Sequence, residues 1–130
     1  MPNQSAPHLY EYAIVRYMPS AERGEFVNIG LVMMCKRRKW LRARVEPDCG
    51  RIAAIAPAAD TSMLRQQCDV FHSICAGTPA GHPIASLAAE ERFRWLTAVR
   101  SASIVTSRPH PGHSADLDAT FERLYAELVL

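Results

Sequence analysis

Residues 25–35 read EFVNIGLVMMC, and this stretch decides the fold. It is apolar on both of its alternating faces, which is typical of a central strand covered on both sides. The run is shorter than the ~18 residues that a membrane helix needs, and Asn28 and Gly30 interrupt it. The stretch therefore predicts the middle of a sheet and no transmembrane span.

Two further strands flank this one in the sequence. Residues 9–18 (LYEYAIVRYM) are rich in β-branched and aromatic residues, and turn residues follow them. Residues 40–46 (WLRARVE) alternate strictly, and Pro47, Asp48 and Gly50 then end the pattern. We expect the three strands to form an antiparallel meander.

Because side chains alternate along a strand, the apolar positions predict which face of the meander is the core face. That set is Ala13, Val15, Val27, Ile29, Leu31, Met33, Leu41, Ala43 and Val45. Matching its members places Val15 near Ile29 and Leu31 near Ala43. The opposite face then carries Arg16, Phe26, Asn28, Gly30, Val32, Met34, Trp40, Arg42 and Arg44.

The rest of the chain predicts three helices and one more strand. After Pro57 a helical stripe consists of Leu64, Cys68, Phe71 and Cys75, and a loop rich in glycine and proline follows at residues 77–83. Ser86 is the expected N-cap of a second helix that runs to about Ala98, with Glu90 and Glu91 near its positive end. Residues 101–107 (SASIVTS) fit a short strand, and residues 108–113 a proline-rich loop. The last helix has the stripe Leu117, Phe121, Leu124 and Leu128.

The expected fold class is therefore α+β, with a four-stranded, mainly antiparallel sheet packed against three helices. Its core should include Val15, Val27, Ile29, Leu31, Leu64, Phe71, Phe93, Leu96, Phe121 and Leu124. The 130 residues, 48% of them apolar and 22% charged, suit one soluble domain over residues 10–130 after a flexible tail at residues 1–9.

The N-terminus and the cysteines predict a cytoplasmic protein. Residues 1–8 lack the pattern of a signal peptide. The four cysteines form no CxxC pair, so we expect free thiols, with Cys68 and Cys75 packed in the core rather than bound to metal.

No common catalytic motif occurs: a P-loop, GxGxxG, GxSxG and HExxH are all missing from the sequence. We therefore expect a protein that is not an enzyme and that has no cofactor and no bound metal. His110 and His113 leave open a small enzyme with a two-imidazole site, although a turn with exposed histidines is the simpler interpretation.

The stretch from Arg23 to Gly30 (RGEFVNIG) places charge, an amide and two glycines at the start of a strand meant for burial. Asn28 in a central strand needs hydrogen-bond partners or costs ~1–3 kcal/mol, and Arg16 is its expected neighbour. Such residues either tie the first loop to the sheet or form a recognition site. In the second case the binding residues are Arg16, Arg23, Glu25, Asn28 and Arg92.

A basic hairpin is the alternative binding site. Lys36, Arg37, Arg38, Lys39, Arg42 and Arg44 are six of the 15 basic residues, and Trp40 lies among them. Cations attract phosphates, and an indole ring stacks on bases, so this hairpin could bind nucleic acid. The net charge of only +2 weighs against that function, and a hairpin tip is also an ordinary place for solvated charge.

Three groups of residues resemble a known family. They are residues 12–17 (YAIVRY) with the Arg23 to Gly30 stretch, residues 91–96 (ERFRWL), and Arg100, Ser101, His110 and Gly112. The chain resembles the small bacterial proteins catalogued as domain of unknown function 3037, over nearly its whole length after the tail. The resemblance implies a stand-alone bacterial protein with a HipA-like kinase as a possible partner, and it implies no catalytic residues. From the polar residues placed inside apolar patterns we expect a non-enzymatic protein-binding or adaptor domain.

Overall fold

The computed structural model describes residues 7–20, 22–77, 83–98 and 103–130. The strands in these ranges are β1 (His8–Tyr17), β2 (Val27–Cys35), β3 (Trp40–Val45), β4 (Ile104–Thr106) and β5 (His110–Ser114). The helices are α1 (Cys49–Ile55), α2 (Thr61–Ala76), α3 (Ala89–Leu96) and α4 (Leu117–Leu128), with a short 3₁₀ turn, η2 (Pro83–Ser86), before α3. The expected α+β class is confirmed, with one strand and one α-helix more than predicted among the described residues.

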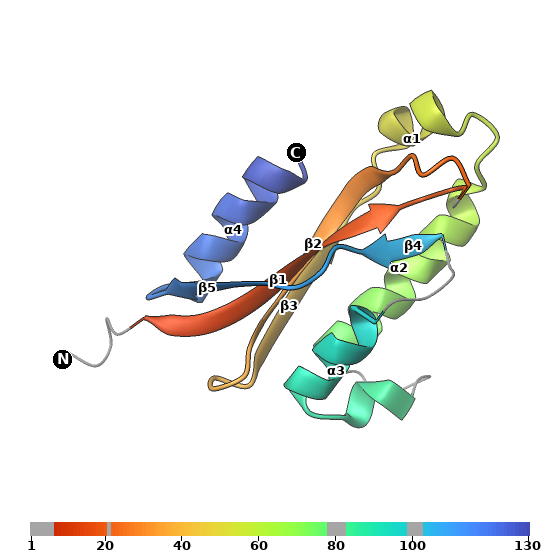
Figure 1. The fold of residues 1–130 in the computed structure, drawn as a ribbon. Helices are drawn as coiled ribbons and strands as arrows, with labels where there is room; N and C mark the ends of the chain where they lie inside the picture. Colours follow the sequence, from red (N-terminus) through yellow and green to blue (C-terminus); the bar gives the residue numbers. More distant parts are fainter. Residues whose placement is uncertain (1–6, 21, 78–82, 99–102) are drawn as a thin grey trace.

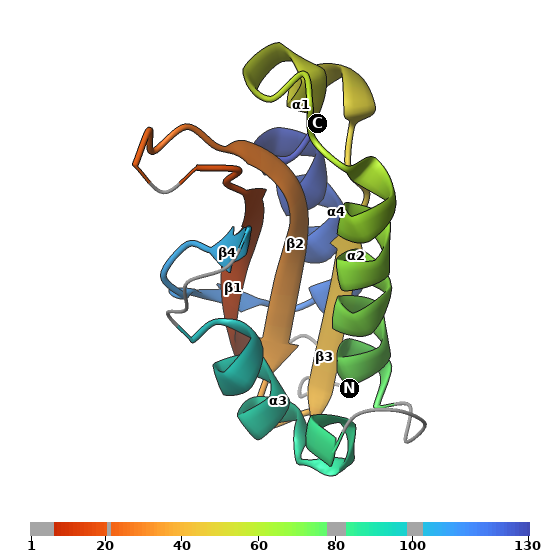
Figure 2. The same ribbon diagram turned by 90° about the vertical axis from the view of Figure 1, so that its right-hand side faces the viewer.

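All described strand pairs are antiparallel, and the sheet has the order β3-β2-β1, with β4 and β5 both paired to the outer edge of β1. β4 pairs with the end of β1 and β5 with its beginning. Figure 1 shows α4 on one side of this sheet and α2 and α3 on the other. In the turned view of Figure 2, α2 runs alongside β3, with α4 behind the sheet.

The sheet has a core on each face, as the doubly apolar β2 predicted. On the α2 face, β1 and β2 pack against Ile52 of α1, Phe71 of α2 and Phe93 of α3. On the α4 face, Tyr10 and three residues of β2 pack against Leu117, Phe121, Leu124 and Tyr125. All ten residues expected in the core are buried.

A β-bulge in β2 makes the predicted register wrong. Arg16 pairs with Asn28 but Val15 pairs with Gly30, so Ile29 is an extra residue with no partner of its own on β1. A strand that gains one residue reverses its alternation. Consequently Leu31, which pairs with Arg44 rather than with Ala43, faces α4.

The predicted faces of β2 are correct before the bulge and exchanged after it. Before it, Val27 and Ile29 face α2 as expected. Beyond it, Leu31 and Met33 lie in the α4 core, and Val32 and Met34 take their places on the α2 face. The predicted core positions of β1 and β3 are all found on the α2 face: Ala13, Val15, Leu41, Ala43 and Val45.

The predicted helices differ from the observed ones at their ends. α2 is confirmed, with all four residues of its stripe buried. α1 was not predicted; Asp48, interpreted as a turn residue, caps its N-terminus by accepting from the backbone N–H groups of Gly50 and Arg51. Ser86 belongs to η2 and is not the cap of α3, whose N-cap is Ala88.

The proline-rich segment was wrongly predicted as a loop, because residues 110–114 form β5 along β1. Pro111 lacks a backbone donor, but an edge strand tolerates it. The expected fourth strand is shorter than predicted: β4 covers Ile104–Thr106, and residues 101 and 102 lie outside the described residues. Residues 1–6 of the expected tail also lie outside them, whereas His8 and Leu9 belong to β1.

Ser107 joins β4 to β5 and is the buried polar residue of the described chain. Its backbone N–H donates to Ile14 O (2.9 Å), and its Oγ accepts from Ile14 N (2.9 Å), so one residue completes both bonds of Ile14 between the two short strands. None of the helices in the described ranges is both long and apolar enough to cross a membrane.

We expect Ser107→Ala to lower the free energy of unfolding by about 1–3 kcal/mol, because the partly buried N–H of Ile14 loses its acceptor. Chemical denaturation measures this directly. Ser62→Ala, which removes an exposed hydroxyl bonded to Asp60, is the matched control and should change the free energy by less than about 0.5 kcal/mol. Equal stability of the two variants would contradict the role given to Ser107.

Candidate binding surface

Arg16 and Asn28 are cross-strand partners on the α4 face of the sheet, as predicted. Asn28 Nδ2 donates to the carbonyl oxygen of Leu128 at the end of α4 (3.0 Å). Since that carbonyl only accepts, the orientation of the amide is determined and Asn28 Oδ1 points away from it. Oδ1 is buried and accepts no hydrogen bond from the described residues.

Arg16, the cross-strand partner of Asn28, also has an unpaired polar atom. Its Nε is buried and unpaired, and within the described ranges no acidic side chain forms an ion pair with its guanidinium. The guanidinium lies over the ring of Phe26, with 4.4 Å from Cζ to the ring centroid. Phe26 itself is 43% exposed.

Arg23 and Glu25 lie beside Phe26 in the loop before β2. Arg23 Nε donates to Glu25 Oε1 at 2.6 Å, and both side chains are exposed. The hydrogen bond from Arg23 lowers the pKa of Glu25. We call Arg16, Arg23, Glu25, Phe26 and Asn28 the Arg16 surface.

Arg92, the fifth predicted binding residue, lies elsewhere. Its Nη1 donates to the carbonyl oxygens of Ile74 (3.0 Å) and Cys75 (2.7 Å), and its Nε donates to that of Leu87 (3.0 Å). The two bonds from Nη1 reach carbonyl groups in the last turn of α2, where Ile74 O also accepts from the backbone N–H of Gly77 (3.1 Å). Arg92 thus holds the end of α2 on the face of the sheet opposite α4, apart from the Arg16 surface.

The basic residues of β3 are neutralised by α4. Arg42 pairs with Asp118 (3.0 Å) and Glu122 (2.6 Å), and Arg44 makes two hydrogen bonds to Glu122 (2.9 and 2.8 Å). Both guanidinium groups also lie over the ring of Phe121. Trp40, expected to stack on bases, is partly buried against the α4 core.

The charged side chains at the hairpin tip are exposed to solvent. Lys36, Arg37, Arg38 and Lys39 are exposed; Lys36 pairs with Glu90 at 3.4 Å, and Arg38 Nη1 lies 3.3 Å from His8 Nε2. The seven residues proposed for nucleic-acid binding are therefore split between this tip and a strand covered by an acidic helix.

Glu122 should make stability depend on pH. The hydrogen bonds from Arg44, and then the one from Arg42, lower its pKa to about 2. A carboxyl group whose pKa is lowered by folding stabilises the protein above its unfolded pKa of ~4.3 and loses that effect as the pH falls through the folded value. We expect Glu122→Gln to lower the melting temperature by a few degrees at pH 7, with the difference from the unmodified protein disappearing near pH 2.

Thermal unfolding between pH 2 and pH 7 measures this difference. Glu127→Gln is the matched control, because Glu127 pairs with one exposed arginine, Arg123 (3.3 Å), on the same helix. A difference for Glu122→Gln that stays constant with pH, or that equals the one for Glu127→Gln, would contradict the assignment.

His110 and His113 do not converge. Both are exposed on β5, and residues three apart in a strand point to opposite faces. His110 lies against the ring of Tyr12, with 5.3 Å between ring centroids. Among the described residues, no group of three or more histidine, cysteine or acidic side chains is arranged to hold a metal ion.

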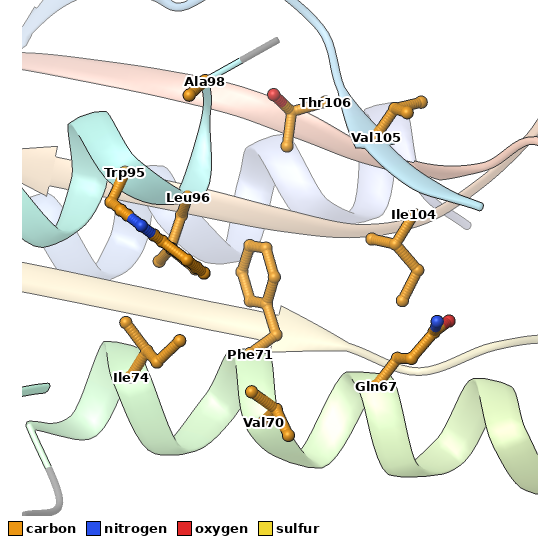
Figure 3. A pocket seen from close by; sticks show the side chains of 10 residues that line it. All are labelled: Gln67, Val70, Phe71, Ile74, Trp95, Leu96, Ala98, Ile104, Val105 and Thr106. Carbon is orange, nitrogen blue, oxygen red and sulfur yellow. The ribbon is translucent and has the colours of Figure 1, made fainter. Parts of the chain in front are cut away.

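An apolar pocket of about 210 Å³ opens between α2, the end of α3 and β4. Figure 3 shows Phe71 pointing into it between Leu96 and Ile104, with Val105 pointing away. Among the described residues its lining contains no titratable side chain and is mostly apolar.

Most of the motif residues identified from the sequence have defined places in the fold, whereas Arg100 and Ser101 lie outside the described residues. The sequence model described as "Protein of unknown function (DUF3037)" matches residues 12–129. The chain belongs to this family. Neither the search of curated proteins nor that of solved structures found a match.

The structure separates the DUF3037 motif residues by role. Gly112 approaches Tyr10 so closely that a Cβ would lie 2.5 Å from the phenol ring, and Arg94 makes two bonds to Glu11 (2.9 and 2.6 Å). With Arg92 these residues support the fold. Arg16 and Asn28 keep buried polar atoms unpaired, which such a role does not explain.

The sequence analysis did not identify the roles of Phe26 in the Arg16 surface and of Ser107 beside β1. Phe26 was identified only as a strand residue on the polar face, because an apolar side chain next to a buried run gives no sign of exposure. Ser107 was identified only as the end of a strand, since nothing in SASIVTS marks the hydroxyl that pairs with Ile14.

Proposed function

We propose that the protein is a non-enzymatic adaptor of the bacterial cytoplasm that binds another protein through the Arg16 surface. One observation supports this most: Phe26 is 43% exposed, and the guanidinium of Arg16 lies over its ring at 4.4 Å from Cζ to the centroid. The unpaired Arg16 Nε and Asn28 Oδ1 are closed off from solvent. A partner that covers Phe26 removes its exposed ring from water.

The composition of the surface favours a protein partner. Protein interfaces are enriched in aromatic residues and arginine, and their strongest contacts lie in pockets from which water is excluded. Phe26 and Arg16 provide that combination. Nucleic-acid binding is the weaker candidate, because Arg42 and Arg44 already pair with Glu122 and the open cations of the basic hairpin are confined to its tip.

A HipA-like kinase is the first partner to test. The pairing of this protein with a HipA-like kinase is implied by the family resemblance and is part of the proposed function. The test is capture of partners from native bacterial cells on the tagged protein, and on a tagged HipA-like kinase encoded beside it.

The variants for this capture are chosen as matched pairs. Arg16→Ala and Phe26→Ala change the Arg16 surface, whereas Arg37→Ala removes an open cation at the hairpin tip. Arg23→Ala has its control in Arg123→Ala, since both arginines form exposed ion pairs. We expect a partner that is lost with Arg16→Ala and Phe26→Ala and kept with both controls; equal recovery by every folded variant would contradict the proposal.

The nucleic-acid alternative makes a separate prediction. Four exposed cations at the tip would give a log–log salt slope of about −3 to −4 on duplex DNA. Fluorescence anisotropy with labelled oligonucleotides at two salt concentrations measures it. Salt-sensitive binding that Arg37→Glu and Arg38→Glu abolish would place nucleic acid above the adaptor function.

A further inference from the structure

We infer that the outer edge of β3 binds an extended peptide segment, which adds to the sheet as a further strand beside α2. β3 ends the sheet on the side away from β4 and β5, and the site shares no residue with the Arg16 surface. The inference therefore goes beyond the proposed function and does not depend on it. It rests on unpaired backbone groups of β3, on an open cavity that reaches them and on the apolar lining of that cavity.

The hydrogen bonds on either side of β3 show which of its backbone groups are free. Glu46 donates its backbone N–H to β2 at 2.8 Å, whereas the N–H of Val45 donates to Nε2 of His72 in α2 at 3.0 Å. Val45 therefore directs its backbone groups outward, and in an antiparallel ladder every second residue does the same. The N–H and C=O groups of Leu41 and Ala43 thus also point outward, and among the described residues nothing is hydrogen-bonded to them.

An open cavity of about 290 Å³ gives access to these groups. Leu41 and Ala43 line it from β3, and His72, Cys75 and Ala76 line it from α2. In the view of Figure 2, α2 runs alongside β3, so the cavity lies between the helix and the edge of the sheet. Residues 40–44 of β3 are partly exposed. A ligand in this cavity therefore lies against the free edge of β3.

The main chain of another polypeptide is the ligand that fits these groups. Leu41 and Ala43 each present one donor and one acceptor, at the spacing with which an added strand pairs. An anion would satisfy the N–H groups alone, and a cation the carbonyl oxygens alone. Proteins that bind a peptide by adding it to a sheet edge gain affinity from such main-chain bonds and specificity from pockets for alternate side chains.

The lining of the cavity determines which side chains the segment carries. Paired residues in a sheet direct their side chains to the same face. Residues opposite Leu41 and Ala43 therefore direct theirs to the α2 face, where Cys75 and Ala76 leave a small apolar space. The residue between them lies beside Arg42, which is already paired with acidic residues of α4. The segment should thus have two apolar residues separated by one residue of any type.

The probe is the peptide acetyl-Ser-Val-Thr-Val-Ser-amide, and its titration is followed by the backbone ¹H–¹⁵N signals of Leu41 and Ala43. One control peptide has both valine nitrogens methylated, which keeps the side chains and removes the donors that face β3. A second has serine in place of both valines. Ala76→Tyr fills the cavity, and Gln66→Tyr is its matched control, because it places the same side chain at another exposed position of α2.

We expect the valine peptide to shift the signals of Leu41 and Ala43 and to slow hydrogen exchange at both amides. Methylation of its valine nitrogens should weaken binding at least about tenfold, because hydrogen bonds to β3 are lost. The serine peptide and Ala76→Tyr should each weaken it to a similar extent, whereas Gln66→Tyr and Arg16→Ala should leave it unchanged.

Unmoved signals of Leu41 and Ala43 would overturn the inference, as would equal binding of the methylated or the serine peptide. The comparison of peptides uses the unmodified protein, so it holds even where Ala76→Tyr does not fold. Loss of peptide binding in Arg16→Ala would also overturn the inference, because it would place the peptide on the Arg16 surface.

Discussion

Gly30→Ala should leave the protein largely unfolded. A Cβ on Gly30 would lie 2.5 Å from the carbonyl oxygen of Arg44 and 2.8 Å from the Cα of Val45, and both are backbone atoms of β3. β2 and β3 would have to separate at the bulge in the middle of the sheet. We expect the free energy of unfolding to fall by more than about 4 kcal/mol, which is most of the total for a domain at the lower end of the usual range of ~5–15 kcal/mol.

Gly24→Ala is the control, because it makes the same change in the same motif. Gly24 has a positive φ of 72°, and a Cβ added to it would meet no atom within 4 Å beyond its chain neighbours. Alanine at position 24 should therefore lower the free energy of unfolding only by the cost of a left-handed backbone conformation, about 1–2 kcal/mol. Circular dichroism and denaturant titration compare the two variants. A folded Gly30→Ala protein as stable as Gly24→Ala would mean that β2 and β3 do not approach as described.

Phe121→Ala should lower the free energy of unfolding by about 3–5 kcal/mol, the range for truncating a buried phenylalanine. Phe121 is fully buried in the α4 core, and Arg42 lies over its ring at 4.3 Å from Cζ to the centroid. The substitution leaves a cavity beneath Leu31 and Met33 and removes the ring on which the guanidinium packs. α4 should therefore loosen from the sheet.

Phe26→Ala is the matched control, since Phe26 is 43% exposed and should lose less than about 1 kcal/mol. Denaturant titration gives both values, and hydrogen exchange should show faster opening of α4 in Phe121→Ala. If the two substitutions cost the same, α4 does not cover a second core.

The pattern of the sequence was sufficient for β1 to β4, for α2 and for the existence of two covered faces, because period-2 and period-3.6 repeats follow directly from backbone geometry. It was not sufficient for the faces of β2 beyond Ile29. A bulge adds one residue without any change in composition, so Leu31 and Met33 were placed on the wrong side. β5 was missed because prolines and glycine in HPGHS hide an edge strand.

The candidate site was predictable in part. Arg16 and Asn28 were expected as neighbours because the amide interrupts a buried run, and their pairing is confirmed. Arg92 was grouped with them since it too is polar within an apolar pattern, yet its bonds to Ile74 and Cys75 depend on how α3 meets the end of α2. Contacts between distant segments of this kind leave no periodic sign in the sequence. For the same reason the pairing of Arg42 and Arg44 with Glu122 was not foreseen.

The most direct test of the adaptor function is photo-crosslinking in native cells with p-benzoylphenylalanine in place of Phe26. The same probe in place of Met63, which is 57% exposed on α2, is the control. We predict a discrete adduct with another protein at position 26 that is absent at position 63 and is lost when Arg16→Ala is added. The absence of an adduct at position 26, or the same adducts at both positions, would contradict the account.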